Sequence, residues 1–213
     1  MNRWAFCAAC ALVVLALVGE TASAQNQLAN SGFESPITSD GAPFVGFWEG
    51  FAGGGASAAN SPEMPRSGTQ SLMLAIAQTD NTFAGVFQDV PNLTPGMLAT
   101  FSGFHKTTSS PLDLDTEVRI EWRNSVSNSE VGRTPNLSPV PTGDYGPFSL
   151  SAAVPAGADT ARVVYAIQTF TGGPSNTGTV FIDDVSFVVP EPSVVALAGV
   201  TALGLLRRRR ARA

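Results

Sequence analysis

The sequence predicts an all-β domain, a β-sandwich of the jelly-roll type with about eight to nine strands, flanked by an N-terminal signal peptide and a short C-terminal transmembrane helix. Two observations predict the strands. Apolar and charged residues alternate with a period of two, as in Val118, Ile120 and Trp122 against Arg119 and Glu121. In addition, no stretch between residues 25 and 189 has the apolar spacing of an amphipathic helix.

Nine segments are expected to be strands, and clusters of proline and glycine separate them at regular intervals. They are residues 27–33, 44–51, 72–76, 82–90, 97–106, 117–123, 148–154, 161–169 and 179–188. Two segments rich in glycine or proline, residues 50–59 and 132–146, are expected to be mobile loops.

Residues 1–24 have the pattern of a signal peptide. Arg3 precedes an apolar run that ends at Gly19, and the small residues before Ala24 suit cleavage after that residue. The alternative is an uncleaved anchor, but the run is short and no positive stop signal follows it. Cys7 and Cys10 both lie in this segment. The exported part would therefore hold no disulfide, no cysteine nucleophile and no cysteine-ligated zinc.

Residues 190–213 combine Pro190, Glu191 and Pro192 with fourteen uncharged residues and then four consecutive arginines. As a helix, the uncharged run spans ~21 Å against a hydrocarbon core of ~30 Å, and arginine snorkelling reduces the mismatch. The arginines predict a cytoplasmic C-terminus. The alternative is an ordinary C-terminal membrane tail.

This arrangement resembles the PEP-CTERM sorting signal of Gram-negative bacteria that make exopolysaccharide. In that family a membrane-embedded exosortase recognises the tripeptide, here Pro190, Glu191 and Pro192, and removes the anchor. The resemblance implies export with the help of signal peptidase and exosortase. It also implies a transient inner-membrane anchor and a final place at the cell surface or in the extracellular matrix.

The charge between the two terminal segments is strongly negative. Six basic and fifteen acidic groups give this part a net charge of −9. Binding of nucleic acid relies on released counterions and needs a basic surface, so this class of function is excluded.

A second resemblance covers nearly all of residues 25–189. Residues 28–34 (LANSGFE), 66–72 (RSGTQSL), 101–104 (FSGF) and 180–187 (VFIDDVSF) resemble, in this order, segments of carbohydrate-binding-module-like and galactose-binding-like jelly rolls. The resemblance implies a structural calcium with side-chain ligands Glu34 and Asp183. Asp184 is the substitute, and backbone carbonyls of residues 66–68 complete the shell.

The alternation of the last strand also singles out Asp183. It places Asp183 on one face with Phe181, Val185 and Phe187, where a bare carboxylate is costly. A calcium ion would remove that cost. The alternative, equally open at this stage, is that backbone amides or Arg66 satisfy the acids without a metal.

A sugar site needs aromatic faces and polar groups that meet solvent. Trp48 and Trp122 are expected in the core. The candidate ligand-binding residues are Tyr145, in a proline- and glycine-rich loop, and the strip Arg119, Glu121 and Arg123. The pattern of the strip favours the alternative, a solvated sheet surface with cross-strand ion pairs.

Catalysis finds little support in the sequence. Glu117 and Glu121 would lie ~13 Å apart along one strand, too far for a glycosidase pair, and His105 is the only histidine. The sequence therefore predicts a noncatalytic, glycan-binding jelly roll on an exosortase-processed protein of the cell surface or exopolysaccharide. The alternatives are a purely structural matrix or envelope protein, and a secreted glycan-active hydrolase.

Overall fold

The computed structural model describes residues 25–110, 112–173 and 175–189, and residues 26–189 form one compact unit. Ala24, the Pro190-Glu191-Pro192 motif and the expected C-terminal helix lie outside the described residues, so they stay predictions. Within the described ranges, no helix has the length and apolar character needed to cross a membrane.

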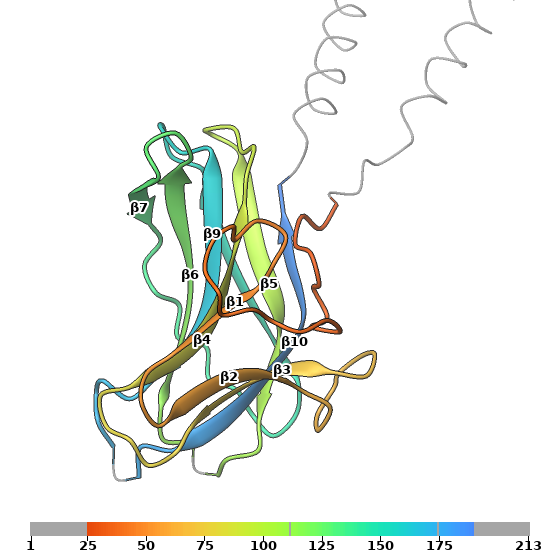
Figure 1. The fold of residues 1–213 in the computed structure, drawn as a ribbon, viewed down its shortest axis with the longest axis vertical. Coiled ribbons are helices and arrows are strands. Elements are labelled where there is room, and N and C mark those ends of the chain that lie inside the picture. The colour runs from red at the N-terminus through yellow and green to blue at the C-terminus, as the bar shows by residue number, and fades with distance from the viewer. Residues whose placement is uncertain (1–24, 111, 174, 190–213) are drawn as a thin grey trace, which may run out of the picture. The chain divides into compact units, whose positions relative to one another are not determined.

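Ten strands form two five-stranded antiparallel sheets (Figure 1). The first sheet has the order β1-β4-β9-β6-β7, and the second has the order β2-β3-β10-β5-β8. The bounds are β1 Glu49–Ala52, β2 Ala56–Ser61, β3 Ser71–Ile76, β4 Phe83–Val90, β5 Leu98–Thr107, β6 Asp115–Asn124, β7 Ser129–Arg133, β8 Gly146–Ala153, β9 Thr160–Gln168 and β10 Gly178–Val188.

The two sheets bury a shared apolar core, as the period-two pattern predicts. Alternate residues of β4, β5, β9 and β10 point into it, among them Val86, Phe101, Tyr165 and Ile182. Trp48 and Trp122 are also buried in this core, which confirms their expected position. The all-β sandwich predicted from the sequence is therefore confirmed for the described residues.

The N-terminal segment does not form the predicted strand over residues 27–33. Only two isolated backbone bonds tie it to β10, from the amide of Gln27 to the carbonyl of Phe187 and from the amide of Val185 to the carbonyl of Ser31. Asn30 and Phe33 then take left-handed backbone angles, which end any extended run. The Phe33 ring is nevertheless fully buried, 5.2 Å from the ring of Trp48. Its apolar side chain belongs to the core although its backbone belongs to a loop.

Two loop predictions are wrong in part. Residues 50–59, expected to be mobile, contain most of β1 and β2, and only the glycines between them form a turn, with Gly55 at φ 75°. The segment 132–146 begins inside β7, which pairs with β6 through Gly132 and Trp122. Small and polar residues form these edge strands, so composition alone suggested loops.

A bulge in β10 changes which residues share a face. The register with β5 shifts between Asp183 and Ser186, and Asp184 has φ 48°. Val185 belongs to the core cluster between the sheets, whereas Asp183 lies under residues 66 and 67. The prediction that Asp183 shares a face with Val185 and Phe187 is therefore wrong, because the bulge inserts an extra residue.

Candidate functional site

The outer face of the first sheet carries a continuous row of phenylalanine rings. On β4, Ala84 and Val86 point into the core, so Phe83 and Phe87 point outwards. The register of β1 with β4 sets Phe51 opposite Gly85 on this same face. Phe44 precedes β1 and Phe170 follows β9, and both extend the row.

Each ring of this phenylalanine row contacts the next. The centroids of Phe44 and Phe87 are 4.8 Å apart, those of Phe87 and Phe51 6.0 Å, those of Phe51 and Phe83 5.9 Å, and those of Phe83 and Phe170 6.1 Å. Phe170 is 52% exposed and Phe83 is 37% exposed. Phe44, Phe51 and Phe87 are half-buried. A row of this kind, with two exposed rings, offers apolar faces to a ligand.

Gly85 is required beneath this row. A Cβ atom at residue 85 would lie 2.4 Å from Cζ of Phe51 and 2.8 Å from the backbone oxygen of Tyr165. The absent side chain therefore lets Phe51 lie across β4.

A charged strip runs beside the phenylalanine row on the same sheet. It comprises Glu117, Arg119, Glu121 and Arg123 of β6, and β9 lies between it and β4. Arg119 donates to Glu121 at 2.8 Å and also pairs with Glu117. Glu121 is only 6% exposed, so the strip is less solvated than expected. Most of its ion pairs run along β6, and the contact of Glu121 with Arg133 of β7, at 4.0 Å, crosses strands.

Arg162 of β9 lies between the row and the strip, opposite Asp89 of β4 on one side and Glu121 of β6 on the other. Its guanidinium forms two bonds with Asp89, at 2.7 and 3.0 Å. It also lies 4.8 Å from the centroid of Phe44 and 4.1 Å from that of Phe87. This combination of a bidentate pair and ring stacking holds the rings of the row in place.

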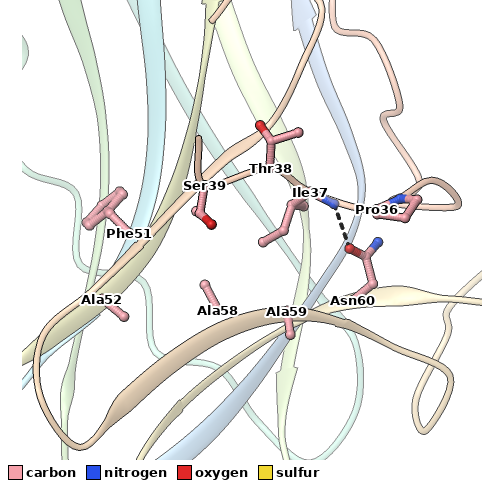
Figure 2. Close-up of a pocket in the computed structure, with 10 residues that line it drawn as sticks. Pro36, Ile37, Thr38, Ser39, Phe51, Ala52, Ala58, Ala59 and Asn60 are labelled. Carbon is pink, nitrogen blue, oxygen red and sulfur yellow. Dashed lines mark hydrogen bonds between the residues drawn. The ribbon is translucent and has the colours of Figure 1, made fainter. Parts of the chain in front are cut away.

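An open groove of about 440 Å³ adjoins the row at the edge of the sandwich. Phe51 belongs to both. Figure 2 shows Ile37 and Ser39 of the N-terminal segment opposite Ala58 and Ala59 of β2. The amide of Ile37 donates to Oδ1 of Asn60 at 2.8 Å, which fixes the segment over β2.

Tyr145 does not join this face. It directly precedes β8 of the second sheet. Its hydroxyl donates a hydrogen bond of 2.5 Å to the carbonyl of Met64, and Nζ of Lys106 lies 5.5 Å from the centroid of its ring. Burial raises the pKa of Tyr145 to about 12. The structure therefore brings Arg119, Glu121 and Arg123 together but separates Tyr145 from them.

The predicted calcium ligands lie next to the loop between β2 and β3, Asp183 on β10 of the second sheet and Glu34 in the N-terminal segment. Both carboxylates accept N–H bonds there. Oδ2 of Asp183 accepts from the amides of Arg66 and Ser67 at 2.8 and 3.1 Å, while Glu34 accepts from Thr69 and Gln70. Hydrogen bonds lower the pKa of Glu34: the hydroxyl of Thr69 makes the largest contribution, and the amides of Thr69 and Gln70 add to it.

Asp183 is fully buried, and burial raises its pKa while the amides of Ser67 and Arg66 lower it. Arg66 directs its side chain to Asp184, and its guanidinium lies 3.5 Å from the ring centroid of Phe104. This arrangement is the metal-free alternative, because N–H groups face the carboxylates where a cation would bind. Within the described ranges, no group of three or more His, Cys, Asp or Glu side chains has metal-binding geometry.

His105 is part of the core. It is 3% exposed, and its Nδ1 lies 2.6 Å from the hydroxyl oxygen of Tyr165. Burial lowers its pKa to about 4. A side chain enclosed in this way has no access to a substrate, so its surroundings give it a packing role.

The phenylalanine row was missed by sequence reasoning. The sequence does contain a pattern that indicates it, because Phe83, Gly85 and Phe87 alternate with other residues and so share one face of a strand. The other face of the same segment, with Ala84 and Val86, is equally apolar. The alternation therefore did not tell which of the two faces meets solvent.

Comparison with known proteins identifies the fold of the chain but no family to which it belongs. No protein-family model matches the chain. No curated protein matches it either. The CBM22-1 xylan-binding domain of Xyn10C from Paenibacillus barcinonensis is similar in structure, with 16% identity, a TM-score of 0.54, and coverage of 79% of this chain and 97% of that domain.

Parts of enzymes share the same fold. The enzymatically active domain of tailspike protein 4 of bacteriophage CBA120 has 16% identity and a TM-score of 0.58 over 77% of this chain, which spans only 21% of the tailspike chain. Arabinose-bound MgGH51 α-L-arabinofuranosidase has 14% identity and a TM-score of 0.54, with coverage of 83% of this chain and 28% of that one. At these identities the likeness shows the fold alone: residues 26–189 have the jelly-roll β-sandwich fold of carbohydrate-binding modules.

Proposed function

We propose that residues 26–189 form a noncatalytic glycan-binding module that holds a polysaccharide on the outer face of the first sheet. The observation that carries this proposal is the phenylalanine row, in which five rings each contact the next, beside a strip of charged groups. Stacking on aromatic rings is the usual way for a protein to bind the apolar face of a sugar, and neighbouring polar groups bind its hydroxyls. The similarity in fold to a xylan-binding domain supports this function.

Binding to polysaccharides tests the proposal directly. The full-length chain, purified in detergent, is expected to be retarded in gels that contain a bound polysaccharide and to release heat when titrated with oligosaccharides of the same polymer. Phe83→Ala is expected to weaken this binding about tenfold, equivalent to about 1.4 kcal/mol, because it removes an exposed ring that joins Phe51 to Phe170 in the row.

Leu98→Ala is the matched control. Leu98 is an exposed apolar residue of β5, which lies in the second sheet, so its truncation is expected to leave the affinity unchanged. Equal losses in the two variants would contradict the assignment to the first sheet. Failure to bind any polymer would favour a purely structural matrix protein, and release of reducing ends would favour a glycan-active hydrolase.

The proposal includes the route of export. Residues 1–24 act as a signal peptide, and exosortase cuts at or near Pro190-Glu191-Pro192, so the module reaches the cell surface or extracellular matrix. Mass spectrometry of the protein from its native host is expected to show an N-terminus at Gln25 and a C-terminal peptide ending between Pro190 and Pro192. Recovery of peptides that continue through the arginines to Ala213 in the exported protein would contradict processing.

Calcium at Glu34 and Asp183 stays a proposal, set against the metal-free arrangement described above. If calcium stabilises the module, EDTA lowers the melting temperature by several degrees and added calcium restores it. An unchanged melting temperature is the result that the amide-bonded carboxylates predict. The Glu34→Gln variant serves as the control, because it removes one of the two ligands and with it any effect of EDTA.

A further inference from the structure

The charges of the first sheet narrow the class of ligand. We infer that this face selects a neutral polysaccharide and rejects polymers of uronic acids or sulfated sugars. The inference rests on the proposed glycan-binding function and adds the substrate class to it. An anionic polymer would need a guanidinium on this face that is free to bind it.

Every arginine on the face contacts a carboxylate. Arg162 forms its two bonds with Asp89, and Arg119 pairs with Glu117 and Glu121. These guanidinium groups already have the partners that an acidic sugar would offer. Binding a uronate there would require breaking a bidentate or doubly paired contact, at a cost that the new contact only repays in part.

Arg133 and Arg123 have carboxylate partners too, although the contact of Arg123 is longer. Arg133 of β7 makes two bonds of 2.7 Å with Glu130, and this contact lowers the pKa of Glu130. Arg123 lies 3.8 Å from Glu121 and donates to the carbonyl of Asn128. Within the part of the chain that the structure describes, the face therefore presents no unpaired arginine.

The carboxylates of the face outnumber its arginines. Glu49, Asp89, Glu117, Glu121 and Glu130 accompany four arginines, and Asp115 stands at the end of β6. The net charge of the face is therefore negative, so an anionic polymer meets repulsion on approach as well as a lack of free cations. A neutral polymer meets neither penalty.

The uncharged groups of the face suit a neutral sugar ring. Phenylalanine has no hydrogen-bonding group, so the row recognises a ring only through its C–H face. Gln168 of β9 lies between Phe83 and Asp115 in the register and is only partly buried. Its amide offers both a donor and an acceptor for a sugar hydroxyl beside the row.

Two panels of polymers test the inference. The full-length chain in detergent is titrated into neutral polymers (xylan, β-1,4-mannan and mixed-linkage β-glucan) and acidic polymers (polygalacturonate and alginate), at about 50 mM and about 500 mM salt. Binding of a neutral polymer with little dependence on salt, together with no binding of the acidic ones, is expected. Acidic polymers bound at least as tightly as neutral ones would overturn the inference and leave glycan binding intact. No binding to either panel would instead overturn the proposed function.

A charge variant tests the reason for the selection. Glu130→Gln removes the closer carboxylate partner of Arg133, whose side chain is 49% exposed and then keeps only the 4.0 Å contact with Glu121. This change is expected to raise binding of alginate or polygalacturonate at low salt by about fivefold or more. Glu63→Gln makes the same change of charge at an exposed residue between β2 and β3, away from the face, and is expected to have no such effect. Equal gains in both variants, or no gain in Glu130→Gln, would overturn the pairing argument.

Discussion

Replacing Asp183 by asparagine is expected to lower the free energy of unfolding by about 2 to 4 kcal/mol. One carboxylate here accepts three backbone N–H bonds, from Arg66, Ser67 and Asp184. Asparagine keeps the shape but turns an NH₂ group towards at least one of these donors. Because the residue is fully buried, water cannot easily take the place of the lost acceptor.

The neighbouring residue provides a matched control. Asp184→Asn makes the same chemical change, and asparagine tolerates the left-handed angle of this position. Asp184 pairs with Arg66 at a partly exposed site, so its loss is expected to cost less than about 1 kcal/mol. Urea unfolding of both variants at pH 7 measures the difference. Two similar midpoints would contradict the role of Asp183 as the buried anchor of residues 66 and 67.

Asp183 also shows which features of the structure could be predicted from the sequence and which could not. By resemblance, Glu34 and Asp183 were expected as ligands of one calcium ion, together with carbonyls of residues 66–68, and the structure brings both carboxylates to the loop between β2 and β3. Which atoms face them was not predictable, because it depends on whether carbonyls or amides of the loop turn inwards. The face shared by Asp183 was predicted wrongly, since the bulge at Asp184 leaves no mark in the alternation pattern.

The long central strands were predictable because their own residues carry the pattern. β5, β6, β9 and β10 alternate clearly or form apolar runs between turn residues, and they occupy the expected segments. The edge strands β2 and β7 were not predictable, whereas the edge strand β8 lies largely in its expected segment, residues 148–154. β7 is polar and is stabilised by Arg133 through contacts with Glu130 and Glu121, which depend on the pairing with β6. Tertiary context therefore decided these elements.

The candidate site was half predictable. The strip Arg119, Glu121 and Arg123 was expected on an outer face from its alternation with Val118 and Ile120, and the structure places it there. Its proximity to the phenylalanine row was not predictable, because β4, β9 and β6 meet only through the strand order of the sheet. The segments that form the site come from distant parts of the chain.

Acidification is expected to destabilise the module through His105. The ring lies between the sheets against Phe148 and Tyr165, and burial lowers its pKa to about 4, below the value of about 6.5 in an unfolded chain. The unfolded state therefore binds a proton that the folded state rejects. The stability that depends on neutral His105 is complete above pH 6.5 and is lost as the pH falls towards 4. The loss reaches up to about 3 kcal/mol.

A neutral substitute separates this effect from that of the carboxylates. His105→Gln keeps a hydrogen-bonding group near the hydroxyl of Tyr165 but does not titrate, whereas the acids of the chain titrate alike in both proteins. Burial also raises the pKa of Tyr165, so that this hydroxyl stays neutral throughout. Urea unfolding from pH 7.5 to pH 4 is therefore expected to show a steeper fall in stability for the original chain than for His105→Gln. Parallel curves for the two proteins would mean that His105 accepts a proton in place. In that case the contact between the histidine and the tyrosine would have to be open to water in solution.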